Sequence, residues 1–183
     1  APPANFPPGR RYQPSSVFQS FFPVMPNPIK EALLNRGWAG QTLSRSETVD
    51  RIDPLIRQHI ELNHHYGAAI RHCDDERVVD VLERLQKTAR TDVGKLSETV
   101  LSCGGTPYNG TDLSPEDFTL KGSLSNLFEE LRDLETAFND ALGEELDLEH
   151  QMRTRGVLQA IRSNSQDRLD ALDALQRRIG DAA

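Results

Sequence analysis

The chain has 183 residues and a formal net charge of −7. Residues 1–45 carry five basic side chains against one acidic side chain, so the remainder, residues 46–183, stands at −11. Such an acidic segment is poorly suited to binding nucleic acid, because contacts with phosphate groups need clustered Lys and Arg. The chain also contains no apolar run near the ~20 residues that span a bilayer. We therefore expect neither a nucleic-acid partner nor a transmembrane segment.

The cysteine content favours a reducing compartment. Cys73 and Cys103 fall at opposite ends of one predicted helix, which is too far apart for a disulfide. Two free thiols are typical of such a compartment. The start of the chain, Ala1-Pro2-Pro3, lacks the basic and apolar regions of a signal peptide. We expect a cytoplasmic protein, with a processed periplasmic form as the alternative.

Residues 1–45 differ in composition from the rest. They contain eight of the 11 prolines and six of the eleven aromatic residues, which are Phe6, Tyr12, Phe18, Phe21, Phe22 and Trp38. Proline disfavours long regular elements, whereas so many aromatic residues are unusual in a solvated tail. One short helix is predicted at about 28–36, capped by Asn27. We expect an extended arm that binds a partner or a neighbouring subunit, with folding back over its own bundle as the alternative.

The first long helix is predicted from about residue 46 to residue 73. Its apolar residues recur at steps of three and four, and Ser44 with Glu47 has the spacing of a capping box. Asp53-Pro54 could instead cap and start a helix. A kink or break is therefore expected at Pro54.

The second long helix follows a tight link at Asp74-Asp75 and ends at Gly104-Gly105. Residues 106–113 are predicted to be loop, and Ser114-Pro115 then opens a short helix. This connection could stay at one end of the bundle, which gives a simple up-down topology. It could instead traverse the ~40 Å length of the helices. The second and third long helices would then be parallel.

The third long helix is predicted over about 124–142, ending at Gly143, and the fourth over about 147–179, ending at Gly180. Residues 46–183 show no alternation of period two, the pattern of a half-buried strand. The predicted class is therefore all-α, a four-helix bundle over 46–183 preceded by the arm.

A level of polar residues interrupts the apolar seams of all four helices near their middles: His59, Asn63, Asp92, Glu135, Ser165 and Arg168. Buried carboxylates must either bind something or be balanced by a cation of the protein. We predict that Asp92 and Glu135 pair with Arg168. His59 and Asn63 are expected to complete the hydrogen bonds.

Two stretches carry a resemblance to a known family. Residues 88–105 (TARTDVGKLSETVLSCGG) are similar in cadence to the second helix of the ferritin-like superfamily. Residues 127–142 (LFEELRDLETAFNDAL) resemble the third helix of a bacterial ferritin-like domain of unknown function, found in stress-associated proteins. The resemblance covers about 46–180. It implies a four-helix bundle, and in the di-iron members a Glu on each of two helices and a Glu-x-x-His on each of the others.

Most of that metal-ligand set is missing from this chain. Ala89 and Lys95 stand three residues before and after Asp92, and the fourth helix has no histidine in 161–165. Motifs for phosphate binding, Cys-x-x-Cys redox chemistry or a nucleophile elbow are also absent. We therefore assign no catalytic residue, cofactor or metal.

We favour a non-catalytic structural or interaction protein that docks through its arm. The alternative is an oxidase or ferroxidase of the ferritin-like type that binds two iron or manganese ions. Its atypical site would use His59, Asp92 and Glu135, with Glu61 as a fourth candidate. A third hypothesis is a small-molecule pocket lined by Tyr66, Phe128 and Phe138.

Overall fold

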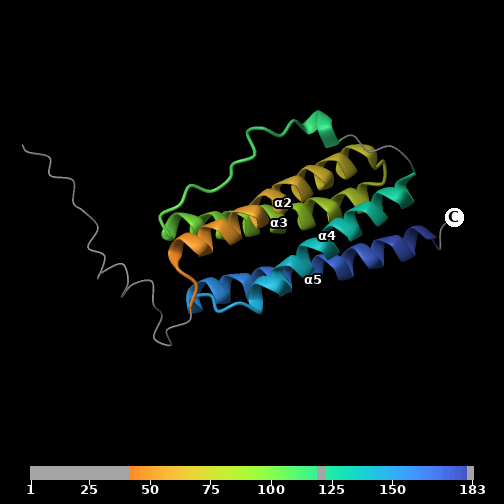
Figure 1. Ribbon diagram of the computed structural model, residues 1–183. Coiled ribbons are helices and arrows are strands. Elements are labelled where there is room, and N and C mark those ends of the chain that lie inside the picture. Colours follow the sequence, from red (N-terminus) through yellow and green to blue (C-terminus); the bar gives the residue numbers. More distant parts are fainter. Residues whose placement is uncertain (1–41, 119–122, 181–183) are drawn as a thin grey trace, which may run out of the picture.

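The computed structural model describes residues 42–118 and 123–180, which form an all-α bundle of four long helices (Figure 1). The helices are α2 (Arg45–His72), α3 (Glu76–Ser102), α4 (Leu124–Leu146) and α5 (Met152–Gly180), with a short 3-10 helix η1 (Pro115–Phe118) before α4. The described residues contain no strand, so the predicted class is confirmed. The short helix expected at 28–36, like the rest of residues 1–41, lies outside the described part.

The start of α2 agrees with the sequence, whereas the expected break does not occur. The Ser44 hydroxyl accepts the Glu47 N–H at 3.2 Å, and the Glu47 carboxylate accepts the Ser44 N–H at 2.8 Å, which is a capping box. The helix then continues through Pro54 to His72. Pro54 removes one backbone hydrogen bond, and burial of Leu55 and Ile56 beside it stabilises the helix across this point.

The turn between α4 and α5 lies further along the chain than predicted. Helix α4 continues past Gly143 to Leu146, and α5 begins at Met152 instead of residue 147. Gly143 lies inside α4 beside the Arg162 guanidinium, whose Nη2 atom would be 3.0 Å from a Cβ atom at this position. A glycine inside a helix costs only about 1 kcal/mol relative to alanine, so it does not by itself end α4.

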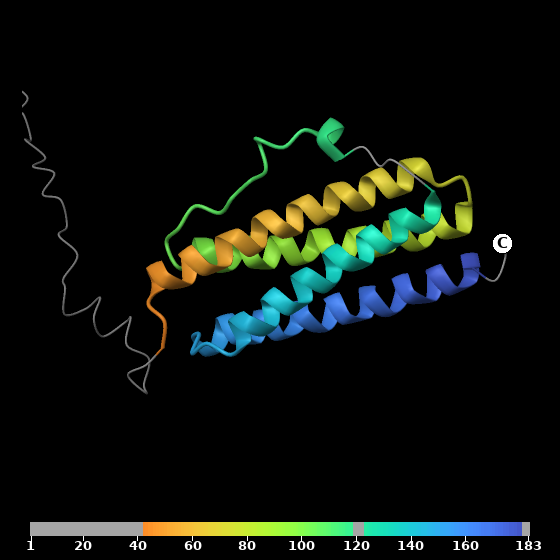
Figure 2. The same cartoon turned by 45° about the vertical axis from the view of Figure 1, so that its right-hand side comes forward.

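The connection between α3 and α4 traverses the bundle along the outer side of α2 (Figures 1 and 2). Near the start of α2, the Tyr108 N–H donates to Asp53 Oδ1 at 2.7 Å. Near its end, the Phe118 ring of η1 stacks on His64 with centroids 4.7 Å apart. Helices α3 and α4 therefore run in the same direction. This arrangement decides between the two topologies that the sequence left open.

Two apolar clusters fill the bundle, one towards each end. The cluster nearer His72 includes Leu62, Leu82, Phe128, Leu131 and Leu172, and the other includes Ile52, Ile56, Leu96, Phe138 and Leu158. All four long helices contribute to both clusters. The predicted polar level lies between them. In the part of the chain that the structure describes, no helix has the length and apolarity needed to cross a membrane.

Candidate functional site

The candidate site is a charged layer in the middle of the bundle. It brings together Asp92 from α3, Glu135 from α4, and Ser165 and Arg168 from α5, and none of these residues is more than 1% exposed. His59 of α2 borders the layer and is also fully buried. The steps of three and four along each seam point these side chains inward at one level. Burial of this kind makes charge balance necessary.

Arg168 is the centre of the charged layer. Its Nε and Nη2 atoms donate to Glu135 Oε1 at 3.0 and 2.8 Å, and its Nη1 atom donates to Asp92 Oδ2 at 2.8 Å. One guanidinium thus joins carboxylates from two other helices. The planar fork of arginine suits such a role, because it offers several donors in a fixed geometry.

The other carboxylate oxygens also have donors. Glu135 Oε1 accepts from the Ser165 hydroxyl at 2.7 Å, and Glu135 Oε2 accepts from the Tyr66 hydroxyl at 3.1 Å. Asp92 Oδ1 accepts from Lys95 Nζ at 3.0 Å and from Asn164 Nδ2 at 2.7 Å. Every carboxylate oxygen of the layer therefore accepts at least one hydrogen bond. Two acids face two cations, Arg168 and Lys95.

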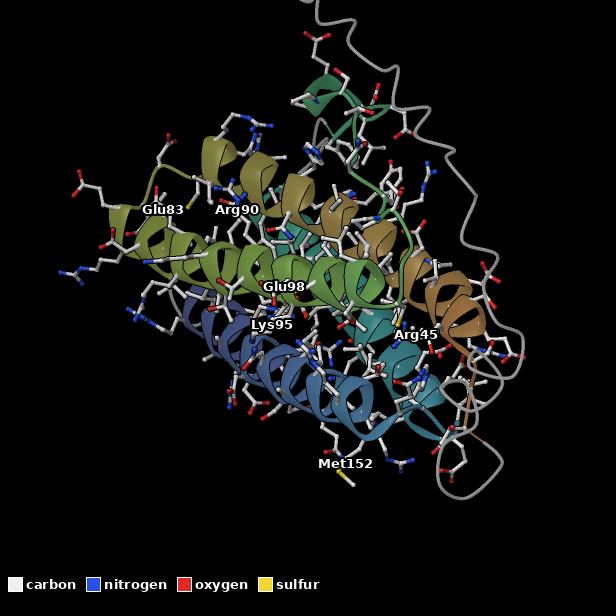
Figure 3. The ribbon with its side chains drawn as sticks, turned by 90° about the vertical axis from the view of Figure 1, so that its left-hand side faces the viewer. Arg45, Glu83, Arg90, Lys95, Glu98 and Met152 are labelled. Atoms are coloured by element: carbon white, nitrogen blue, oxygen red, sulfur yellow. The ribbon has the colours of Figure 1, made fainter. Side chains whose placement is uncertain are left out.

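Tyr66, Lys95 and Asn164 belong to this network, although the sequence analysis did not place them in it. The Asp92–Lys95 spacing of three residues on one helix was a usable signal. Figure 3 shows Lys95 on the side of α3 that faces α5. Tyr66 lies on the α2 seam one turn from the layer, where its ring resembles any other core aromatic residue. Its hydroxyl group, which donates to Glu135, is what makes it part of the network.

The surroundings fix the protonation states of two members of the layer. Burial alone would lower the pKa of Arg168, but hydrogen bonds and charge from Glu135, with hydrogen bonding from Asp92, outweigh it and raise the pKa. Burial, followed by the nearby Glu135 charge, holds the pKa of Tyr66 well above its ordinary value. Arg168 is therefore a permanent cation, and Tyr66 remains a neutral donor.

His59 does not make the hydrogen bonds expected of it. Its ring stacks on Phe138 with centroids 4.0 Å apart, and neither ring nitrogen has a hydrogen-bond partner among the described residues. Burial, followed by the charge of Arg168, lowers the pKa of His59 well below its ordinary value. The backbone of Ala89 opposes this shift, although its approach does not meet hydrogen-bond geometry. His59 is therefore a neutral, stacked ring.

Asn63 also differs from the expectation, because it bonds to the backbone instead of the carboxylates. Its Nδ2 atom donates to the His59 carbonyl one turn earlier at 2.7 Å. Its Oδ1 atom is buried and has no donor within the described part of the chain. Asn63 therefore lies beside the charged layer and faces the junction of α2 with α3, where it lines a hollow.

The three aromatic residues proposed to line a pocket are instead core residues. Tyr66, Phe128 and Phe138 are each at most 1% exposed. Tyr66 and Phe128 belong to the apolar cluster nearer His72, and Phe138 belongs to the other cluster. Their surroundings are other core side chains of the bundle.

Among residues 42–118 and 123–180, no group of three or more His, Cys, Asp or Glu side chains is placed to hold a metal ion. His59, Asp92 and Glu135 approach one level of the bundle, but Arg168 bridges the two acids. Glu61 instead accepts from Arg57 Nε at 3.0 Å on the outer side of α2. The four candidate ligands of the metal hypothesis are therefore not gathered into one set.

Comparison of the chain with protein-family models, with curated proteins and with solved structures gives no match. The class that fold and site define is an all-α bundle of four helices with a charged layer in its core.

Proposed function

We propose that this chain is a non-catalytic structural or interaction protein, a ferritin-like bundle that docks on a partner or a larger assembly through residues 1–45. The observation that carries this proposal is the satisfied charged layer. Each oxygen of Asp92 and Glu135 already accepts a hydrogen bond from the protein, and Arg168 donates to two of these four oxygens. Such a layer specifies how helices fit together, because a shifted register leaves buried charges unpaired.

The ferritin-like part of the proposal is supported by the chain path. Two antiparallel hairpins, α2–α3 and α4–α5, are joined by a segment that traverses the bundle and leaves α3 and α4 parallel (Figure 2). One long crossover of this kind is typical of ferritin-like bundles, which residues 88–105 and 127–142 also resemble in sequence.

Composition and position support a docking role for the arm. Its last residues join the bundle beside the α4–α5 turn, where the Leu43 N–H donates to the Glu149 carbonyl at 2.8 Å. Six aromatic residues precede this point, within a segment of net charge +4. Aromatic residues dominate the energetics of protein interfaces. A basic, aromatic arm suits a partner with apolar pockets and an acidic rim.

Deleting residues 1–41 is expected to leave a folded bundle that no longer retains its partner. The charged layer and both apolar clusters lie within the residues that remain. Circular dichroism and cooperative unfolding would test the fold, and co-purification with tagged full-length and truncated proteins would test the interaction. In the full-length chain, Phe21→Ala with Phe22→Ala should weaken the interaction, and exposed Leu101→Ala on α3 is the matched control.

Two outcomes would contradict the arm proposal. A truncated protein that fails to fold would mean that the arm completes the core of its own bundle. A truncated protein that folds and retains its partner would place the interaction on the bundle surface.

The second candidate function is a di-iron or di-manganese oxidase. It is supported by the positions of His59, Asp92 and Glu135, which lie at about the same height along the bundle. Elemental analysis of the purified protein separates the two candidates. Iron or manganese at a stoichiometric level would favour the oxidase, with Arg168 displaced from the carboxylates to admit the ions.

A further inference from the structure

An open hollow of about 270 Å³ lies at the junction of α2, α3 and the traversing connection. We call it the Arg90 hollow. It is lined by six residues, Ile60, Asn63, His64, Arg90, Val93 and Asn109. Figure 3 shows Arg90 on the side of α3 that faces α2.

The walls of the Arg90 hollow are held in place by contacts between the three elements. Gln86 Nε2 of α3 donates to the Asn63 carbonyl of α2 at 2.9 Å. The connection lies close on α2 at Gly110, where a Cβ atom would approach Ile60 Cγ2 to 3.0 Å. Gly110 has φ +69, a conformation that favours glycine. The hollow is therefore formed before any ligand arrives.

The charges that line the Arg90 hollow are unusual for this acidic body. Arg90 and His64 are its basic residues, and no Asp or Glu is among the six lining residues. On the outer side of α2, Arg57 is paired with Glu61 and Asp112. Arg90, by contrast, makes no ion pair with any residue in 42–118 or 123–180. An unpaired guanidinium is a ready receptor for a carboxylate.

The remaining lining residues define the rest of the ligand. Ile60 and Val93 offer apolar surface to a bound molecule. Pockets for drug-sized ligands usually measure about 300–1,000 Å³, so a hollow of 270 Å³ suits a smaller molecule.

We propose that the Arg90 hollow binds a small monocarboxylic acid with an apolar body. The carboxylate receives hydrogen bonds from Arg90, and the apolar body lies against Ile60 and Val93.

Titration of the isotope-labelled full-length protein with phenylacetate tests this proposal. At about 0.15 M salt, screening over about 8 Å suppresses non-specific attraction to the protein. NMR shifts are expected at the Asn63 and Asn109 side-chain amides and at the Val93 methyl groups. Neutral phenylacetamide, which has nearly the same shape, should bind at least about tenfold more weakly, because it cannot form the charge-assisted hydrogen bond.

Arg90→Gln should weaken phenylacetate binding by about tenfold or more, the effect of losing one charge-assisted hydrogen bond. Arg77→Gln is the matched control, since Arg77 is also exposed on α3 but lines neither the Arg90 hollow nor the neighbouring hollow that Arg90 shares with Arg84. The control should change the affinity less than twofold.

Three results would overturn the proposal. The first is an absence of shifts at the lining residues up to tens of millimolar phenylacetate. The second is equal affinity for phenylacetate and phenylacetamide, which would exclude carboxylate recognition. The third is equal weakening by Arg90→Gln and Arg77→Gln, which would indicate general attraction to basic side chains.

Discussion

Replacing Arg168 by Leu is expected to destabilise the bundle by about 3–5 kcal/mol, the cost of breaking a buried ion pair by removing one partner. The substitution leaves Asp92 and Glu135 facing each other across the core with only Lys95 as a cation. Urea denaturation followed by circular dichroism measures the loss as a shift in midpoint at constant slope.

A surface ion pair provides the control for Arg168→Leu. Arg132 Nε lies 2.7 Å from Asp173 Oδ1, a shorter distance than any ion pair of Arg168, but both side chains are nearly half exposed. Arg132→Leu should therefore cost only about 0–1 kcal/mol. Equal effects of the two substitutions would mean that the charged layer does not depend on Arg168. If the metal hypothesis holds instead, Arg168→Leu should be tolerated and should tighten iron or manganese binding.

Lowering the pH from 7.5 to 5.5 is expected to destabilise the wild-type bundle by about 1 kcal/mol through His59 alone. The pKa of the buried ring is well below its ordinary value, whereas in the unfolded chain it is about 6.5. The unfolded state therefore binds more protons between these two values, so stability falls as the pH falls below about 6.5. Other titratable groups also act in this range, and a variant must isolate His59.

His59→Leu isolates this effect. The variant should lose about 1 kcal/mol less stability than the wild type between pH 7.5 and 5.5, measured by urea denaturation at both pH values. His65, whose pKa burial also lowers, is present in both proteins and cancels in the comparison. Removing an unsatisfied buried ring should also make the variant about 1–3 kcal/mol more stable at pH 7.5. Parallel pH profiles of the two proteins would show that His59 does not titrate on unfolding.

The four long helices could be predicted from the sequence, because spacing and capping residues act locally. Ser44 and Glu47 mark a helix start wherever the rest of the chain lies, and the capping box forms as predicted. The topology could not be predicted. The path of the connection depends on contacts such as Tyr108 with Asp53 and Phe118 with His64, which join residues far apart in sequence.

The charged layer could be predicted only in part. Asp92, Glu135 and Arg168 interrupt apolar seams at the middle of their helices, so their meeting follows from helix length and spacing. Asn164 lies one residue from Ser165 and reaches Asp92 only because of the way α5 packs on α3. His59 and Asn63 were expected to bond to the acids. Instead, the His59 ring stacks on Phe138, and the Asn63 amide donates to a backbone carbonyl.

The division of the layer between the two hairpins has a consequence for how the molecule assembles. The α2–α3 hairpin supplies Asp92 and Tyr66, and the α4–α5 hairpin supplies Glu135 and Arg168. Each hairpin balances its own acid, Asp92 with Lys95 and Glu135 with Arg168. The bonds from Arg168 to Asp92 and from Tyr66 to Glu135, by contrast, join the two hairpins. Sliding one hairpin past the other by a single turn, about 5.4 Å, would break both of these contacts and leave Asp92 Oδ2 and the Tyr66 hydroxyl without their partners. Arrangements in which the hairpins are out of register are therefore less stable than the native one, and the contacts between the hairpins favour a single alignment.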